Sequence, residues 1–144
     1  MRPAAGVQIQ ALIPHRGAMC LLERVVHWDE RQVTAATRTH RSPDNPLRRE
    51  GRLHALHLAE YGAQAAAVHG GLLARAHGAQ APPRLLAAIR DLRLQCADLT
   101  QLAGELILTA TLLIEDGGGC QYGFAVEHAG VEIASGRVAI LRRG

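Results

Sequence analysis

The sequence predicts an α+β fold in which one long helix packs against a single, mostly antiparallel β-sheet. Residues 53–76 have helical character and no charged face, whereas the other segments are short, alternate in polarity and are separated by turn signals. The chain has 144 residues, of which 48% are hydrophobic and 20% are charged. This length and composition support one core, so a single domain is expected to span residues 1–144.

The N-terminal part is predicted to hold a short helix and two strands. Residues 7–13 are apolar and end at Pro14, which favours a helix of about one or two turns. Residues 19–28 alternate in polarity and contain two adjacent valines, which is typical of a strand that is partly buried on both faces. Residues 29–31 form a turn into a second strand over residues 32–40.

The long helix is predicted over residues 53–76. The proline-containing segment 42–46 before it can be neither helix nor central strand, so we expect an ordered loop or a lid there. Gly78 and the proline pair at 82–83 end the helix. Because the helix is apolar all round, it should be buried all round, with the sheet wrapped around it. Its Glu, His, Gln and Gly residues exclude a membrane span.

The C-terminal half is predicted to be all β. Strands are expected over residues 85–97, 105–114, 120–128 and 131–141, because each segment alternates in polarity or is rich in aliphatic residues. The sequence Asp-Gly-Gly-Gly at 116–119 is a strong hairpin signal. Consecutive hairpins imply antiparallel pairing, which gives the element order strand, strand, long helix and four strands.

The composition excludes several classes of function. All 16 basic residues are arginine and the net charge is +3, but no nucleic-acid-binding motif is visible and aromatic residues make up only 3% of the chain, so no nucleic-acid partner is predicted. No nucleophile elbow, P-loop or dinucleotide fingerprint is present, and no cofactor is predicted. Three scattered cysteines and an N-terminus without a signal peptide predict a cytoplasmic protein.

Glu60 is the strongest catalytic candidate, because it is the only acid in the predicted helix. Burying a carboxylate costs on the order of several kcal/mol unless the group is paired or becomes neutral. A carboxyl group with a raised pKa in an apolar channel suits general acid–base chemistry. The alternative is a partly exposed Glu60 at a subunit boundary, paired with an arginine from elsewhere. Gln64 and His57 lie four residues after and three residues before Glu60, so both can line the same groove.

Two further clusters flank this helix. His54, His57 and Glu60 form a row that could hold a divalent metal only if a distant segment supplied a fourth ligand, so no metal site is predicted. A group of arginines follows Pro46, and an acidic protein partner would suit its charge as well as any other ligand. A solvated basic loop is the alternative. The group consists of Arg48, Arg49 and Arg52.

Two segments resemble a known enzyme family. LIPHRGAMCLLERVVHW at 12–28 resembles the opening of the β-hydroxyacyl-acyl-carrier-protein dehydratases, and AEYGAQAAAVHG at 59–70 resembles their helix, in which a catalytic Glu precedes a Gln by four residues. The similarity is closer to a branch of predicted 3-hydroxyacyl-carrier-protein dehydratases, some of which accompany aryl-polyene-type or other fatty-acid-like synthesis clusters. The motifs cover roughly residues 10–75, and the rest is similar in strand order only.

The resemblance implies the hot-dog fold, a long helix wrapped by an antiparallel sheet, which usually forms dimers with active sites at the interface. It implies removal of water from a 3-hydroxyacyl thioester to give the 2-enoyl thioester. A histidine takes the C2 proton, and a Glu, here Glu60, helps the hydroxyl to leave. Gln64 corresponds to the family's Gln, and the backbone near Ala55 to the N–H groups that stabilise the thioester oxygen. The acidic acyl carrier protein would dock on Arg48, Arg49 and Arg52.

The sequence departs from the family at the catalytic histidine. That histidine lies in a Gly-His-Phe-Pro loop fourteen residues before the Glu, where this chain has Pro46, preceded by Asn45. Asn45 can hydrogen-bond a thioester or a water molecule, but it is no base. His15 and His57 are the candidate replacements.

Three interpretations follow from this departure. We favour a dehydratase with a relocated base. A hot-dog thioesterase, in which Glu60 activates water, and a non-catalytic partner of an active dehydratase are the alternatives. The chain would accordingly form a homodimer, or a heterodimer with another dehydratase subunit.

Overall fold

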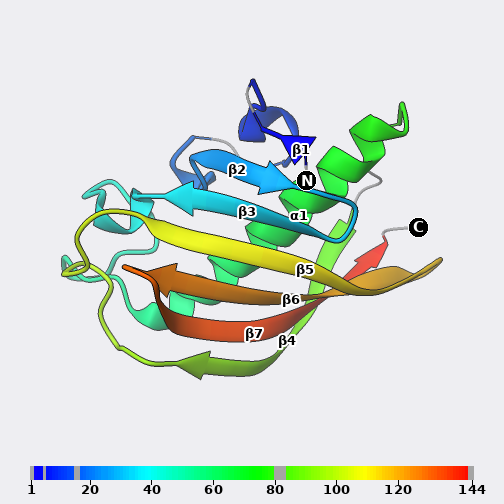
Figure 1. Ribbon diagram of the computed structural model, residues 1–144. Coiled ribbons are helices and arrows are strands. Elements are labelled where there is room, and N and C mark those ends of the chain that lie inside the picture. Colours follow the sequence, from blue (N-terminus) through cyan, green and yellow to red (C-terminus); the bar gives the residue numbers. More distant parts are fainter. Residues whose placement is uncertain (1, 5, 15–16, 80–83, 143–144) are drawn as a thin grey trace.

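A computed structural model describes residues 2–4, 6–14, 17–79 and 84–142 of the chain. It contains one α-helix and a seven-stranded sheet (Figure 1). The elements are β1 (Arg2–Pro3), β2 (Arg24–Trp28), β3 (Gln32–Thr37), α1 (Leu58–Ala76), β4 (Arg84–Leu94), β5 (Leu106–Asp116), β6 (Gly119–His128) and β7 (Val131–Arg142).

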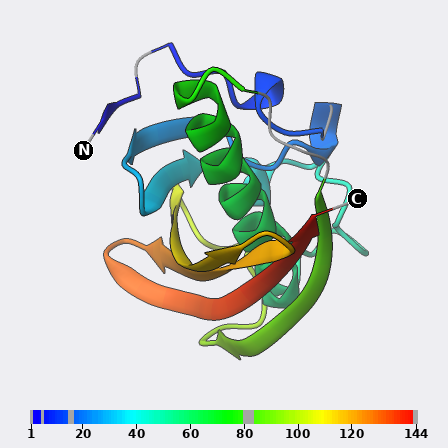
Figure 2. The same ribbon diagram turned by 90° about the vertical axis from the view of Figure 1, so that its right-hand side faces the viewer.

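The sheet has the strand order β1-β2-β3-β5-β6-β7-β4, and every neighbouring pair is antiparallel. Its concave face curves round α1, which packs on the central strands (Figure 2). The predicted order of two strands, a long helix and four strands is therefore confirmed. The two-residue strand β1, which pairs with the end of β2, was not predicted.

The predicted hairpin at residues 116–119 is also confirmed. Asp116 pairs with Gly119 across a two-residue turn. The Asp116 carboxylate accepts hydrogen bonds from the backbone N–H groups of Gly118 and Gly119, at 2.7 and 3.1 Å. This is the capping role that short acidic side chains play in turns.

The predicted boundaries were wrong at the start of β2 and at the end of β3. The strand expected from residue 19 begins at Arg24, because residues 17–19 form a 3₁₀ turn and the backbone of Leu21 bonds to side chains instead of a strand. The strand expected to reach residue 40 ends at Thr37, because a 3₁₀ turn follows at residues 39–41.

The long helix begins later than predicted. Leu53 is not helical, since its carbonyl accepts the N–H of Leu99, and residues 55–57 form a 3₁₀ turn that leads into α1. Glu60 consequently lies in the first turn of α1. No helix in the described ranges is long and apolar enough to cross a membrane.

The helix is buried on most sides but not on all, which corrects the expectation from its composition. Glu60, Ala63 and Ala67 are only partly buried and follow one another at helical spacing, so they form one stripe along α1. On the covered side, Phe124 of β6 lies flat against Gly62, where an added Cβ atom would come within 2.5 Å of the ring. The sheet thus approaches α1 closely on the side away from Glu60, and the stripe that contains Glu60 stays only partly covered.

Candidate active site

Glu60 is positioned by the first turn of α1. Its side chain is half-buried. The ion pairs among described residues join Arg2 to Glu30, Arg24 to Glu105 and Arg137 to Asp91. Within the part of the chain that the structure describes, Glu60 thus has no arginine partner. The carboxyl group is therefore available to a ligand on the open stripe of the helix.

His57 lies one turn before Glu60, at the junction between the 3₁₀ turn and α1, and is half-buried. Residues three apart in a helical segment are neighbours on its surface, so His57 is the described imidazole best placed to act with Glu60. His54 is exposed, and its Nδ1 atom accepts the N–H of Leu56 at 2.9 Å. His15 lies outside the described residues. Among the described residues, no three potential metal ligands cluster around a common point.

The backbone donors at the helix start already have acceptors. The N–H of Ala55 donates to the carbonyl of Ala97 at 2.7 Å, and the N–H of His57 donates to the carbonyl of His54 at 3.0 Å. The N–H of Leu56 has a side-chain acceptor, the exposed His54 ring. Of these three donors, Leu56 would be the easiest for a substrate carbonyl to take over, because a surface side chain can rotate away. The role predicted for the backbone near Ala55 stays a prediction.

Gln64 holds the segment that precedes β2 against α1. Its side chain is 1% exposed. Its Oε1 atom accepts the N–H of Leu21 at 2.8 Å, and its Nε2 atom donates to the carbonyl of Met19 at 2.6 Å. These bonds give Gln64 a structural role one turn after Glu60, and its predicted contact with substrate stays a prediction.

Asn45 fixes the loop at residues 42–46, where the resembling family carries its histidine. The side chain is 6% exposed, and its Nδ2 atom donates to the carbonyl of Thr39 and to the hydroxyl of Tyr61, at 2.9 and 3.0 Å. Its Oδ1 atom accepts the N–H of Leu47 at 2.9 Å. Both amide hydrogens thus have protein acceptors. A substrate contact of Asn45 stays a prediction, and only the oxygen could add a bond without breaking one.

Tyr61 connects these anchors, and we did not single it out from the sequence. Because its hydroxyl accepts from Asn45, the hydroxyl proton goes to Thr39 Oγ1 at 2.9 Å, and Thr39 in turn donates to the carbonyl of Leu21 at 2.6 Å. Burial raises the pKa of Tyr61 above its ordinary value, so the hydroxyl stays protonated. The sequence does contain a signal for this role, because a tyrosine in a buried helix needs a hydrogen-bond partner for its hydroxyl. Gln64 thus binds the N–H of Leu21, and Tyr61 is linked through Thr39 to its carbonyl.

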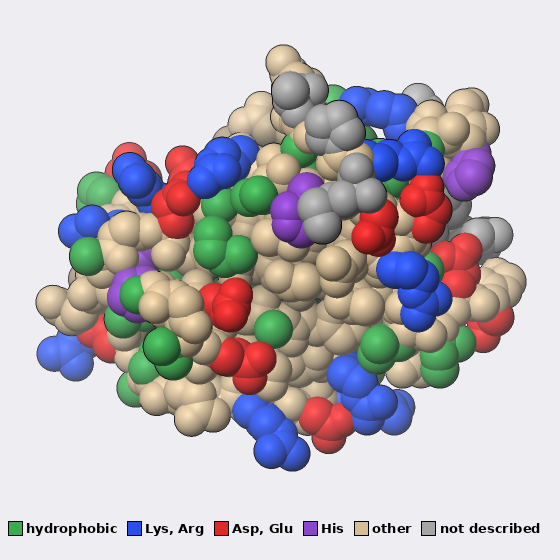
Figure 3. Space-filling model, in the orientation of Figure 1, with side chains coloured by type: hydrophobic (Ala, Val, Ile, Leu, Met, Phe, Trp, Pro, Cys, Tyr) green, Lys and Arg blue, Asp and Glu red, His purple; other side chains and the backbone are tan. Residues whose placement is uncertain are grey.

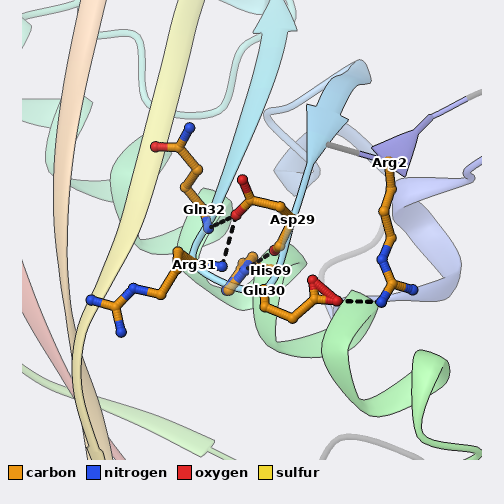
Figure 4. Close-up of polar contacts among 6 residues, drawn as sticks. All are labelled: Arg2, Asp29, Glu30, Arg31, Gln32 and His69. Atoms are coloured by element: carbon orange, nitrogen blue, oxygen red, sulfur yellow. Dashed lines mark hydrogen bonds and ion pairs between the residues drawn. The ribbon is translucent and has the colours of Figure 1, made fainter.

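A second polar cluster lies farther along α1, where His69 meets the turn between β2 and β3 (Figure 4). His69 is fully buried; its Nε2 atom donates to the backbone carbonyl of Asp29 at 2.8 Å, so its Nδ1 atom accepts the Tyr122 hydroxyl at 2.6 Å. Burial lowers the pKa of His69, which keeps the ring neutral. Nine residues of helix place it about 13 Å from Glu60 along the axis. His69 therefore ties the β2–β3 turn to α1 and is no candidate for the base.

The arginine group forms a tight turn before the helix. Arg49 and Arg52 exchange both backbone hydrogen bonds, at 2.8 and 3.0 Å, across Glu50 and Gly51, whose φ angles are +53° and +76°. Two successive positive φ angles define a type I′ turn. Because residues directly opposite each other in such a pair project to the same side, Arg49 and Arg52 share one exposed face.

Arg48 differs from its two neighbours. It is half-buried, and its guanidinium group donates to the carbonyls of His40 and Gly51, at 3.3 and 3.4 Å. Arg49 and Arg52 are exposed. The predicted docking group therefore contains two exposed cations and one that also holds the loop in place.

Comparisons with known proteins agree with this fold. The sequence model of a family described as ApeP dehydratase matches residues 7–143. Among solved structures, a chain of the dehydratase heterocomplex ApeI:P from Xenorhabdus doucetiae has a TM-score of 0.86 at 22% identity, with 96% of this chain and 92% of that chain covered.

Two more distant structures share the fold. The HP0420 homologue from Helicobacter felis gives a TM-score of 0.66 at 14% identity, covering 96% and 92% of the two chains. A hypothetical thioesterase with coenzyme A from Streptococcus pneumoniae gives 0.60 at 11% identity, covering 84% and 85%. No curated protein shows significant sequence similarity. The neighbours confirm the hot-dog fold.

Proposed function

This chain belongs to the ApeP-like dehydratase family, and we propose that it acts, as a dehydratase subunit, on 3-hydroxyacyl thioesters. The observation that carries the proposal is the placement of Glu60. A carboxyl group without an arginine partner in the described part of the chain lies on the open stripe of an otherwise buried helix. Gln64 and Tyr61 fix the neighbouring backbone through buried hydrogen bonds.

In the proposed reaction, a base takes the proton from C2, the C3–O bond breaks, and the Glu60 carboxylic acid gives its proton to the departing hydroxyl. The products are water and the 2-enoyl thioester. A backbone N–H group near the helix start stabilises the negative charge that develops on the thioester oxygen. His57 is the described candidate for the base, and His15 is the other candidate in this chain.

We propose that the chain works together with a second dehydratase subunit. The related structure from Xenorhabdus doucetiae is a dehydratase heterocomplex. The loop at residues 42–46 offers Asn45 where the resembling family has its histidine, and both amide hydrogens of Asn45 have protein acceptors. A second subunit is an alternative source of the base that takes the C2 proton. β4 is hydrogen-bonded to β7 on one side only, which leaves an edge where another sheet could pair. A homodimer is the alternative.

The substrate is proposed to arrive on an acidic acyl carrier protein. Arg49 and Arg52 present two cations on one face of an exposed turn shortly before the helix that carries Glu60. Charge complementarity of this kind speeds the encounter between an enzyme and a charged carrier. We propose a cytoplasmic location, because the three cysteines are scattered along the sequence and form no Cys-x-x-Cys motif.

Thioester hydrolysis is the second candidate function. It is favoured by one observation, the absence of a histidine from the loop at residues 42–46, because Glu60 could activate a water molecule without one. It would release free acid and thiol instead of an enoyl thioester.

Incubation of the chain with a 3-hydroxyacyl carrier-protein thioester distinguishes the candidates. Intact-mass analysis is expected to show loss of one water from the acyl group, either with the chain alone or only after a second hot-dog dehydratase subunit is added. The second result would assign the chain a role as an obligate partner. Release of thiol without any enoyl product would replace the proposed activity with hydrolysis.

A further inference from the structure

We propose that the free edge of the sheet, along β4, selects a partner strand that carries acidic side chains and disfavours a second copy of this chain. The inference rests on the proposed function, in which the chain works with another subunit, and it adds the charge of that partner. It is carried by the exposed side chains of β4 and by the way a bulge arranges them.

β4 offers both backbone and apolar surface to a partner. It is the last strand at one end of the sheet order, and among the described residues it pairs with β7 alone. Leu86 and Ile89 are 36% and 38% exposed, although they lie opposite Ile140 and Val138, which are buried residues of β7. Leu86 and Ile89 therefore belong to the side of the sheet that faces α1, but they lie beyond the cover of the helix. A further strand with its own helix would cover them.

The outer side of the same edge is basic. Arg90 lies opposite Arg137 and Arg93 lies opposite Ser135, so an irregularity in β4 brings two arginines to adjacent positions on one face. Asp91 lies within that irregularity and has a φ angle of +54°. Its carboxylate accepts hydrogen bonds from Nε and Nη2 of Arg137, at 2.9 and 2.5 Å. Blue side chains appear along this rim, at the bottom of Figure 3, where β4 runs in Figure 1.

Arg90 and Arg93 consequently lack a compensating charge. Both are exposed, and neither forms an ion pair within the described ranges of the chain, while the only acid of β4 is taken by Arg137. The strand thus combines an open backbone edge, two uncovered aliphatic side chains and two cations without an acidic partner.

Self-pairing through this edge would place like charges together. In an antiparallel pair related by a two-fold axis near the middle of β4, Arg90 of each copy would lie diagonally across from the other, with Cα atoms roughly 7–8 Å apart. Arg93 would add a second cation from each copy to the same outer face. Like charges across a strand pair destabilise it, whereas a strand with Asp or Glu at the facing positions would form ion pairs with the two arginines.

The test uses the chain itself as the acidic probe. The variant Arg90→Glu/Arg93→Glu presents the complementary charge on the same edge. The control variant, Arg31→Glu/Arg75→Glu, makes the same change in net charge at exposed sites outside β4. Sedimentation velocity would compare wild type, each variant, and equimolar mixtures of wild type with each variant. At about 0.1 M salt, the mixture of wild type with Arg90→Glu/Arg93→Glu is expected to associate roughly tenfold more tightly than wild type alone.

Raising the salt to about 1 M should remove most of that difference, because the Debye length shrinks from about 10 to about 3 Å. The proposal is overturned if wild type alone dimerises as tightly as the mixture of wild type with Arg90→Glu/Arg93→Glu. It is also overturned if the mixture of wild type with Arg31→Glu/Arg75→Glu shows the same increase in affinity over wild type alone. These experiments measure association and not turnover. The proposed dehydratase activity can therefore fail or hold independently of them.

Discussion

At the scale of single residues, the buried polar side chains of α1 differ from Glu60 in having hydrogen-bond partners in other segments. Tyr61, Gln64 and His69 are fully buried, and each hydrogen-bonds to another segment, as buried polar groups must. Glu60 has no such partner in the described part of the chain and lies on the open stripe. The first three residues maintain the fold, whereas the proposed role of Glu60 is chemical.

The buried histidines predict a pH-dependent stability. Burial lowers the pKa of both His69 and His40, so these rings stay neutral in the folded protein at pH values where the unfolded chain takes up protons. Their contribution is fully present above the unfolded pKa near 6.5 and is lost as the pH falls below it. Urea titrations at about pH 7.5 and about pH 5.5 should show a lower free energy of unfolding at the acidic pH, by at most about 1.4 kcal/mol per pH unit for each histidine.

Two variants identify the source of this slope. His69→Gln is expected to flatten the pH dependence, while the exposed His77→Gln should leave it as in wild type. A slope between these pH values that persists unchanged when both His69 and His40 are replaced by Gln would contradict the assignment.

At the scale of elements, the periodicity of the sequence predicted the type and order of the strands and of the long helix, but not where each one ends. Residues 19–23 alternate in polarity like a strand, yet their backbone groups bond to Gln64 and to Thr37 from distant segments. Such long-range bonds leave no periodic trace in the sequence. The same holds for Tyr61 and Asn45, whose bond joins a loop to a helix sixteen residues away.

The contact between α1 and β6 depends on a helical glycine. A Cβ atom on Gly62 would lie 2.5 to 2.7 Å from three ring atoms of Phe124, and a Cβ atom on Gly136 of β7 would lie 2.9 Å from two other atoms of the same ring. Gly62→Ala would normally stabilise a helix by about 1 kcal/mol, but overpacking against a rigid ring should destabilise this protein by roughly 1–3 kcal/mol in urea unfolding.

Gly117→Ala provides the control, because an added Cβ atom there would contact nothing within 4 Å. Phe124→Leu introduced into Gly62→Ala should restore part of the loss, since a smaller side chain relieves the overlap. A Gly62→Ala protein at least as stable as wild type would show that the sheet does not approach the helix this closely.

At the scale of the whole molecule, the accessible features of the described residues are a partly buried stripe that carries Glu60, a basic turn near the helix start and the edge of the sheet along β4. Together they suit a subunit that receives a charged carrier and completes its site with a partner. The sequence could single out Glu60 as a candidate, because a lone acid in an apolar helix can be recognised without a structure. It could not show that Asn45 and Gln64 are engaged in holding loops, nor that β4 lies at the edge, since both depend on tertiary contacts.

The central claim is that Glu60 protonates the departing hydroxyl, and the Glu60→Gln variant tests it most directly. The variant keeps the size of the side chain but removes its acid, so kcat/KM for enoyl formation should fall by about 10²–10⁴-fold, with the free energy of unfolding unchanged. The measurement is the rate of water loss from a 3-hydroxyacyl carrier thioester, followed by intact mass in the presence of the second dehydratase subunit. Turnover by Glu60→Gln at the wild-type rate would contradict the account.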